Sequence, residues 1–148
     1  GSVSKMYLTN NQITDAYLKD NSIKTNIQLV ANTYMNVSYD KLFKWLSLIN
    51  AQLNQKLFRY YQKYPDKRIG FHCCFEYEED NTHSHILLRI PPEYNCINIV
   101  LDVEKLWKEL GYKLKQRGTK FKFYKDFEVE DEKKCTSYTI KRNLHVTI

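Results

Sequence analysis

Two histidines that stand one residue apart, His83 and His85, are the residues of this sequence best suited to chemistry. Their surroundings are typical of a β-strand, in which side chains alternate between two faces, so both imidazoles point the same way. Glu76 and Glu78 stand at the same spacing in the preceding strand-like stretch. If residues 80–81 form a two-residue hairpin loop, Glu78 faces His83 and Glu76 faces His85.

Two imidazoles and one carboxylate make a three-ligand site with open positions, which is typical of a catalytic divalent metal ion. Such an ion can polarise a phosphoryl oxygen and neutralise charge that develops in a transition state. The sequence leaves the acid open between Glu76 and Glu78. The alternative interpretation is a pair of exposed strand histidines without a metal.

Tyr138 and Lys141 form the second candidate pair. Residues 131–142 predict a helix, on which positions three apart share a face. A tyrosine hydroxyl, with an ordinary pKa of about 10, is a poor nucleophile. It can attack a phosphate when a metal withdraws charge and a cation lies close by. Lys141 would supply that cation or position the scissile strand; the alternative is a core-facing tyrosine beside a solvated lysine.

Hydrophobic periodicity predicts the elements that must position these side chains. Alternation indicates strands at residues 27–35, 68–78, 83–90 and 119–130, and three-to-four spacing indicates helices at residues 38–61, 102–111 and 131–142. The order βαββαβ, followed by a helix, predicts an α+β fold of ferredoxin-like or RRM-like type, with an antiparallel sheet, helices on one face and the first and third strands central. The final helix, which carries Tyr138, would cover the open face. Residues 1–26 are poorly patterned and are predicted to be an N-terminal arm of a single domain.

Composition favours a nucleic-acid partner. The 148 residues carry a net charge of +6 and 14% aromatic residues, and cations with exposed rings suit phosphates and unpaired bases. The four cysteines form no CxxC pair, which argues against a disulfide framework or a zinc knuckle. No apolar run reaches about 20 residues and no signal peptide is evident, so we expect a cytoplasmic protein without a membrane partner. A basic segment is a candidate DNA-contact surface, with a solvated edge strand as the alternative; its cations are Lys113, Lys115, Arg117, Lys120 and Lys122.

The order and spacing of these motifs resemble the HUH endonuclease superfamily, and within it the single-tyrosine rolling-circle replication initiators (Rep proteins) of plasmids and single-stranded DNA viruses. The resemblance rests on His83-Ser84-His85, an acid on the preceding strand and the sequence Tyr-Thr-Ile-Lys that ends at Lys141. It covers residues 27–144. It departs at Ser84, where the family usually has a hydrophobic residue, and residues 29–33 match the family's first motif only loosely. The segment around Glu76 is similar to the stretch that carries the family's acidic ligand.

The resemblance implies sequence-specific nicking and rejoining of single-stranded DNA at a replication origin, expected to be a stem-loop. It implies Mn²⁺ or Mg²⁺ held by His83, His85 and Glu76, and a 5′-phosphotyrosine link formed by Tyr138. No Walker motif is present, so we expect unwinding to come from elsewhere, either a separate helicase or a further region outside this sequence. Two alternatives are a single-tyrosine transposase, against which Tyr-x-x-Lys argues, and a non-catalytic RRM-like module for single-stranded nucleic acid. The RRM-like module would need aromatic residues on its open face, where the sequence instead has histidines and acids.

Overall fold

The structure, a computed structural model, describes residues 9–33, 37–78, 81–115, 121–140 and 144–148; the side chains of residues 77, 78, 81, 115 and 144 are also outside the description. The elements follow one another along this described chain. They are α1 (Asn10–Lys19), β1 (Ile23–Asn32), α2 (Tyr39–Leu57), the short 3₁₀ helix η1 (Pro65–Lys67), β2 (Gly70–Glu78), β3 (Asn81–Arg89), α3 (Cys96–Lys115), β4 (Lys122–Asp126), α4 (Glu132–Ile140) and β5 (Leu144–Thr147).

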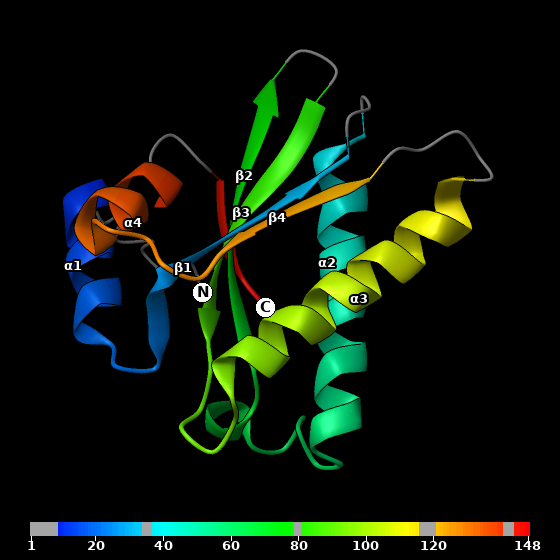
Figure 1. Cartoon of the computed structure of the whole chain (residues 1–148), viewed down its shortest axis with the longest axis horizontal. Helices are drawn as coiled ribbons and strands as arrows, with labels where there is room; N and C mark the ends of the chain where they lie inside the picture. The colour runs from blue at the N-terminus through cyan, green and yellow to red at the C-terminus, as the bar shows by residue number, and fades with distance from the viewer. Residues whose placement is uncertain (1–8, 34–36, 79–80, 116–120, 141–143) are drawn as a thin grey trace, which may run out of the picture.

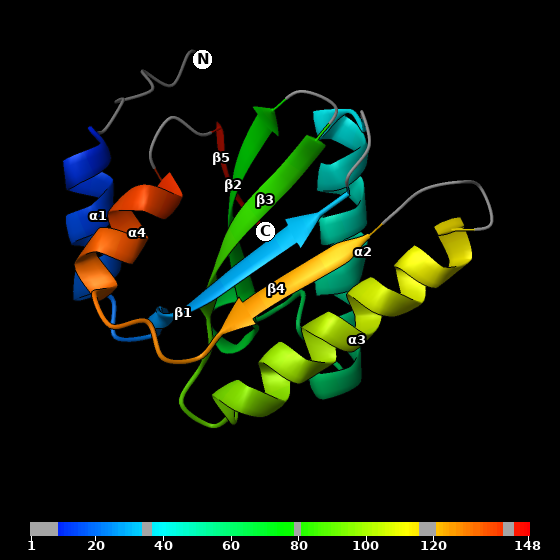
Figure 2. The same cartoon turned by 45° about the horizontal axis from the view of Figure 1, so that its top comes forward.

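The strands form one antiparallel sheet in the order β4-β1-β3-β2-β5. Helices α2 and α3 pack on one side of this sheet, and α1 and α4 lie together on the other side (Figures 1 and 2). The described part of the chain is therefore an α+β fold compatible with the ferredoxin-like type, and the predicted inner positions of the first and third strands are confirmed. No helix among the described residues is both long and apolar enough to cross a membrane.

Alternation along the strands explains which face each side chain takes. Phe71, Cys73 and Phe75 of β2, with Ile86 and Leu88 of β3, are buried in the core beneath α2 and α3. The residues between them face the opposite side, towards α1 and α4. The predicted division of both strands into an apolar and a polar face is confirmed, and it places His83 and His85 on the face away from the main core.

The predicted N-terminal arm is wrong for the described residues 9–26, because they form α1 and the first part of β1. Thr9 and Gln12 make a capping box that begins α1: Gln12 N donates to Thr9 Oγ1 at 3.2 Å, and Thr9 N donates to Gln12 Oε1 at 2.9 Å. The helix then packs against α4. Strand β1 begins at Ile23, and its register with β3 shifts between Lys24 and Leu29. Ile23 and Thr25 before that shift are buried on the side of α1 and α4, where Thr25 donates a hydrogen bond to Glu132 of α4.

The second long helix is twice the predicted length. Asn95 caps it with a side-chain oxygen that accepts from Asn98 N at 3.0 Å, so α3 begins at Cys96 rather than at Asp102. Gly111 does not end α3 either. It is buried within the helix, where a Cβ would lie 2.8 Å from Phe121 Cβ. Gly111 allows α3 to approach Phe121 closely, because only a hydrogen atom fits in the space between them.

The other helices and strands differ from prediction mainly at their ends. Ser38 caps α2 as predicted, through a bond from Lys41 N at 3.2 Å, but this helix ends at Leu57. Strand β4 is shorter than the predicted residues 119–130, and α4 lies within the predicted residues 131–142. Strand β5 was not predicted; it pairs with β2.

Candidate metal centre

The β2–β3 register decides which residues meet at the histidines. The predicted register is wrong by two residues: Glu76 pairs with His83, Cys74 pairs with His85, and Glu78 pairs with Asn81. A shift of two keeps every side chain on its predicted face, so the alternation could not distinguish the two registers. The observed register is supported from outside the hairpin, because Thr82 Oγ1 donates to Val37 O and Thr33 Oγ1 donates to Thr82 O.

Glu76, His83 and His85 converge into one cluster. Glu76 Oε2 lies 2.8 Å from His83 Nε2 and 3.5 Å from His85 Nε2, and the two imidazole rings have centroids 5.2 Å apart. Both histidines are buried, whereas 21% of the Glu76 side chain is exposed. The cluster is therefore held by the sheet and reached from solvent on the side of the carboxylate.

The donor set and its spacing fit a divalent metal ion. One ligand atom from each of the three residues lies within 4.8 Å of the other two. Ligands about 2.1 Å from a common ion stand roughly 3.0–3.4 Å from one another in octahedral or tetrahedral sites. The observed distances from Glu76 Oε2 to the two Nε2 atoms, 2.8 and 3.5 Å, lie on both sides of that range. A neutral imidazole offers an ion the lone pair of whichever ring nitrogen carries no proton.

Glu76 is the acid that the structure brings to both histidines. The alternative, Glu78, pairs with Asn81 at the hairpin end of β2, and its side chain lies outside the described residues. Two residues along a strand correspond to roughly 7 Å. The backbone of Glu78 is thus one full alternation further from His85 than that of Glu76.

A cysteine and a histidine that the sequence analysis did not select lie beside the cluster. Cys74 Sγ lies 3.2 Å from His145 Nδ1, because β5 pairs these residues across the edge of β2. Burial, with a smaller effect of the Glu76 charge, raises the pKa of Cys74 to about 12. Burial lowers the pKa of His145. A neutral thiol is a poor metal ligand, so this pair supports the sheet next to the centre. The contact between Cys74 and His145 could be predicted from the sequence only by predicting β5. The four residues of β5 are too few for a clear strand pattern.

Helix α4 brings Tyr138 next to His85. The two rings have centroids 5.8 Å apart and are almost perpendicular, at 89°. Tyr138 is 59% exposed, whereas Thr136 and Thr139 on the same helix are buried. The predicted core-facing alternative is therefore wrong, and the hydroxyl-bearing side chain lies at the accessible edge of the cluster.

Hydrogen bonds at the start of α4 fix its position. Asp131 Oδ1 accepts from Lys134 N at 2.9 Å and caps the helix. Glu132 Oε2 accepts from Thr25 Oγ1 at 2.9 Å and ties the same turn to β1. Lys141, the predicted catalytic cation, lies outside the described residues.

The candidate DNA-contact cations do not form one surface in the described chain. Lys122 is exposed on β4, and its partner Asn32 pairs in turn with His83, so these three residues share the face of the metal cluster. Lys113 lies instead on α3, on the other side of the sheet. The side chain of Lys115 is not described, and Arg117 and Lys120 lie outside the described residues.

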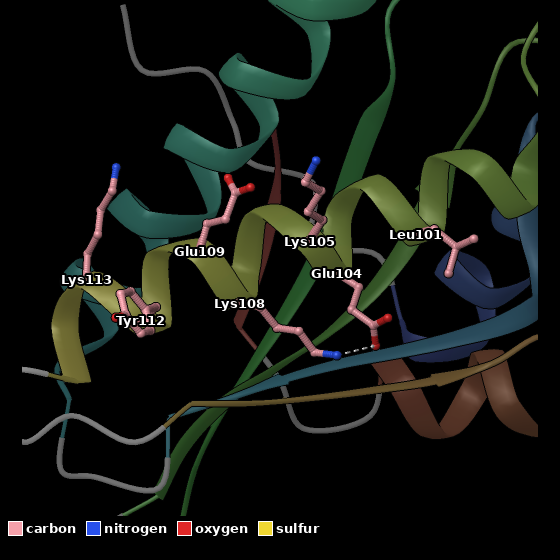
Figure 3. A pocket seen from close by; sticks show the side chains of 7 residues that line it. All are labelled: Leu101, Glu104, Lys105, Lys108, Glu109, Tyr112 and Lys113. Carbon is pink, nitrogen blue, oxygen red and sulfur yellow. Dashed lines mark ion pairs between the residues drawn. The ribbon is translucent and has the colours of Figure 1, made fainter.

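The surroundings of Lys113 carry mixed charge rather than a basic groove. A hollow of about 510 Å³ along α3 has both acidic and basic side chains in its lining (Figure 3). Glu104 within it pairs with Lys108 at 3.8 Å and also with Lys125 of β4. Lys122 is therefore the only cation of the predicted set whose described side chain shares a face with the cluster.

Comparisons with protein-family models, with curated proteins and with solved structures find no significant match to this chain. The site is therefore interpreted from its own chemistry.

Proposed function

We propose that this protein is a metal-dependent endonuclease and strand transferase of the HUH type, which nicks and rejoins single-stranded DNA and initiates rolling-circle replication. The observation that carries the proposal is the position of Tyr138, whose ring lies 5.8 Å from that of His85, beside the Glu76–His83–His85 cluster. A nucleophile at the solvent-accessible edge of a candidate metal centre is the arrangement that phosphoryl transfer to tyrosine requires.

The residues of this chain have distinct parts in the reaction. Tyr138 Oη attacks the phosphorus of the scissile phosphodiester, and the bond from phosphorus to the 3′ oxygen breaks. The proton lost by Tyr138 is balanced by one gained at the departing 3′ oxygen. The products are a 5′-phosphotyrosine and a free 3′-OH. Attack by a 3′-OH on the phosphotyrosine reverses these steps and rejoins DNA without ATP, because the covalent link conserves the phosphodiester energy.

Glu76, His83 and His85 would hold the divalent ion, and Mn²⁺ or Mg²⁺ suits a set that includes a carboxylate and an oxygen-rich substrate. When bound, the ion supplies a positive charge that polarises the scissile phosphate. Lys122 on the same face can pair with a DNA phosphate. Lys141 is proposed as the cation near the Tyr138 oxygen. A single-tyrosine transposase would use the same chemistry and is distinguished by its DNA substrate.

The test is covalent trapping. The protein is incubated with fluorescent single-stranded oligonucleotides from candidate stem-loop origins in Mn²⁺ or Mg²⁺, and adducts are resolved on a denaturing gel. We expect an adduct with wild type and none with Tyr138→Phe, which lacks only the attacking oxygen. Tyr112→Phe is a matched control, because Tyr112 is also an exposed tyrosine, at 73%, and stands on α3 on the other side of the sheet.

His85→Ala should remove metal-dependent cleavage while the circular dichroism spectrum stays that of wild type. An adduct that persists in Tyr138→Phe would exclude Tyr138 as the nucleophile. Tight binding without cleavage of any strand would favour the RRM-like binding module instead.

A further inference from the structure

A second group of exposed rings and cations follows α2, away from the metal cluster. Residues 58–69 read Phe-Arg-Tyr-Tyr-Gln-Lys-Tyr-Pro-Asp-Lys-Arg-Ile. Tyr60 and Tyr64 are about half exposed, at 51% and 49%. Four cations and one carboxylate stand in this stretch, and the carboxylate of Asp66 lies 3.7 Å from Arg89 on β3. The segment is thus basic and aromatic, and its one acid faces a cation.

The cations are arranged around the exposed rings. The Arg59 guanidinium carbon lies 5.6 Å from the Tyr60 ring centroid, and Lys63 Nζ lies 5.7 Å from the same centroid. Lys67 Nζ lies 5.3 Å from the Tyr64 ring. Each ring therefore stands within reach of positive charge while retaining an exposed surface. Aromatic rings that hold bases, flanked by cations that hold phosphates, are the elements of single-strand binding sites.

The surface is hollowed beside Tyr60. A depression of about 400 Å³ is lined by Gln55, Arg59, Tyr60, Tyr61, Gln62 and Lys63. Its size is in the range of small-ligand sites. Glutamine amides can donate to and accept from the edge of an unpaired base. The hollow thus offers stacking, hydrogen bonding and positive charge together, which are the three interactions a nucleotide uses.

This surface is separate from the candidate metal centre. Figures 1 and 2 show the C-terminal end of α2 at the end of the sheet opposite the β2–β3 hairpin. Asp66 of η1 lies 3.7 Å from Arg89, near the end of β3. From the Glu76–His83 pair to the Gly70–Arg89 pair, strand β3 rises by roughly 20 Å.

We infer that residues 59–67 form a second binding site for single-stranded nucleic acid, in which unpaired bases stack on Tyr60 and Tyr64 and phosphates pair with Arg59, Lys63 and Lys67. The site binds strand without cutting it, because the metal cluster and Tyr138 lie elsewhere. This inference does not depend on nicking activity.

The experiment measures binding by fluorescence anisotropy of a labelled 20-nucleotide oligo(dT) in EDTA at fixed salt. We expect Tyr60→Ala/Tyr64→Ala to weaken binding at least tenfold, and Tyr60→Phe/Tyr64→Phe to retain it because the rings remain. Arg59→Gln/Lys63→Gln should reduce the slope of log affinity against log salt by about 1.4, since each phosphate contact on a single strand contributes about 0.7. Tyr112→Ala is the matched control: Tyr112 is 73% exposed and stands on α3 among lysines.

Equal affinities for wild type and Tyr60→Ala/Tyr64→Ala would overturn the inference, as would an equal loss in Tyr112→Ala. A second titration uses the same oligonucleotide annealed to its complement. If Tyr60→Ala/Tyr64→Ala weakened binding of this duplex but not of the single strand, the inference would also be overturned. Circular dichroism melts of each variant exclude unfolding as the cause. Failure of the proposed nuclease appears separately, as absence of adduct with Tyr138 intact, and leaves these affinities unchanged.

Discussion

Substitution of the two candidate acids separates the predicted metal ligand from its neighbour. Glu76→Gln removes the charge that lies 2.8 Å from His83 and 3.5 Å from His85, and changes the volume little. Glu78→Gln makes the same change two residues along β2, opposite Asn81. If Glu76 ligates the ion, only the first substitution should weaken metal binding.

The expected magnitude follows from binding linkage. An ion present at about 100 times its Kd stabilises the folded protein by about 2.7 kcal/mol. For a chain of this length that corresponds to a rise in Tm of about 5–11 °C. Loss of a supporting partner of a ligand already costs up to about 100-fold in affinity, so loss of the carboxylate itself should cost at least that. At the same ion concentration, the ion would raise the free energy of unfolding of the Glu76→Gln variant by about 0.4 kcal/mol, and its Tm by about 1–2 °C.

The assay is a thermal melt with Mn²⁺ titrated from zero, with isothermal calorimetry for the affinity. Wild type and Glu78→Gln should show the same metal-dependent rise in Tm, and Glu76→Gln should show almost none. The reverse pattern would refute the assignment of Glu76. Equal rises in Tm for all three proteins would show that neither Glu76 nor Glu78 is a ligand of the ion.

Three further predictions concern stability. Gly111→Ala should lower the free energy of unfolding by about 1–3 kcal/mol, because the new Cβ would meet Phe121 at 2.8 Å; an unchanged urea midpoint would contradict this. Burial lowers the pKa of His72 below its usual 6.5, so the unfolded chain takes up the proton first and stability should fall as pH drops below about 6.5. Urea midpoints at pH 7.5 and 5.5 should differ less in His72→Gln than in wild type; an equal difference would rule out His72 as a source. Thr9→Ala removes the cap on α1 and should cost about 0.5–2 kcal/mol, seen as faster amide exchange in α1; exchange that stays slow would show that packing alone holds the helix.

Local pattern was enough to predict much of the fold. The alternation in β2 and β3 determined which side chains face the core, because strand geometry fixes a period of two whatever the partner strand. The helical spacing around Leu46 and Ile49 predicted α2, and the order of elements predicted the inner strands. The candidate site residues were found the same way, since His83 and His85 share a face in any register that leaves the strand intact.

Local pattern failed where contacts between distant residues decide the outcome. The weakly patterned α1 is helical because it is capped at Thr9 and packs on α4, and β5 exists through its pairing with β2. The length of α3 depends on a cap at Asn95 that the sequence analysis did not identify. None of these stretches has a strong enough hydrophobic period of its own.

The sequence by itself determined the residue types of the site and the face on which they stand. Only the tertiary structure decided that Glu76 opposes His83, that Cys74 meets His145 and that Tyr138 of α4 lies against His85. The physical reason is that registers two residues apart satisfy the same alternation, so the choice between them depends on packing and hydrogen bonds to other elements. The approach of Tyr138 to His85 likewise depends on how α4 packs against α1, β1 and β3.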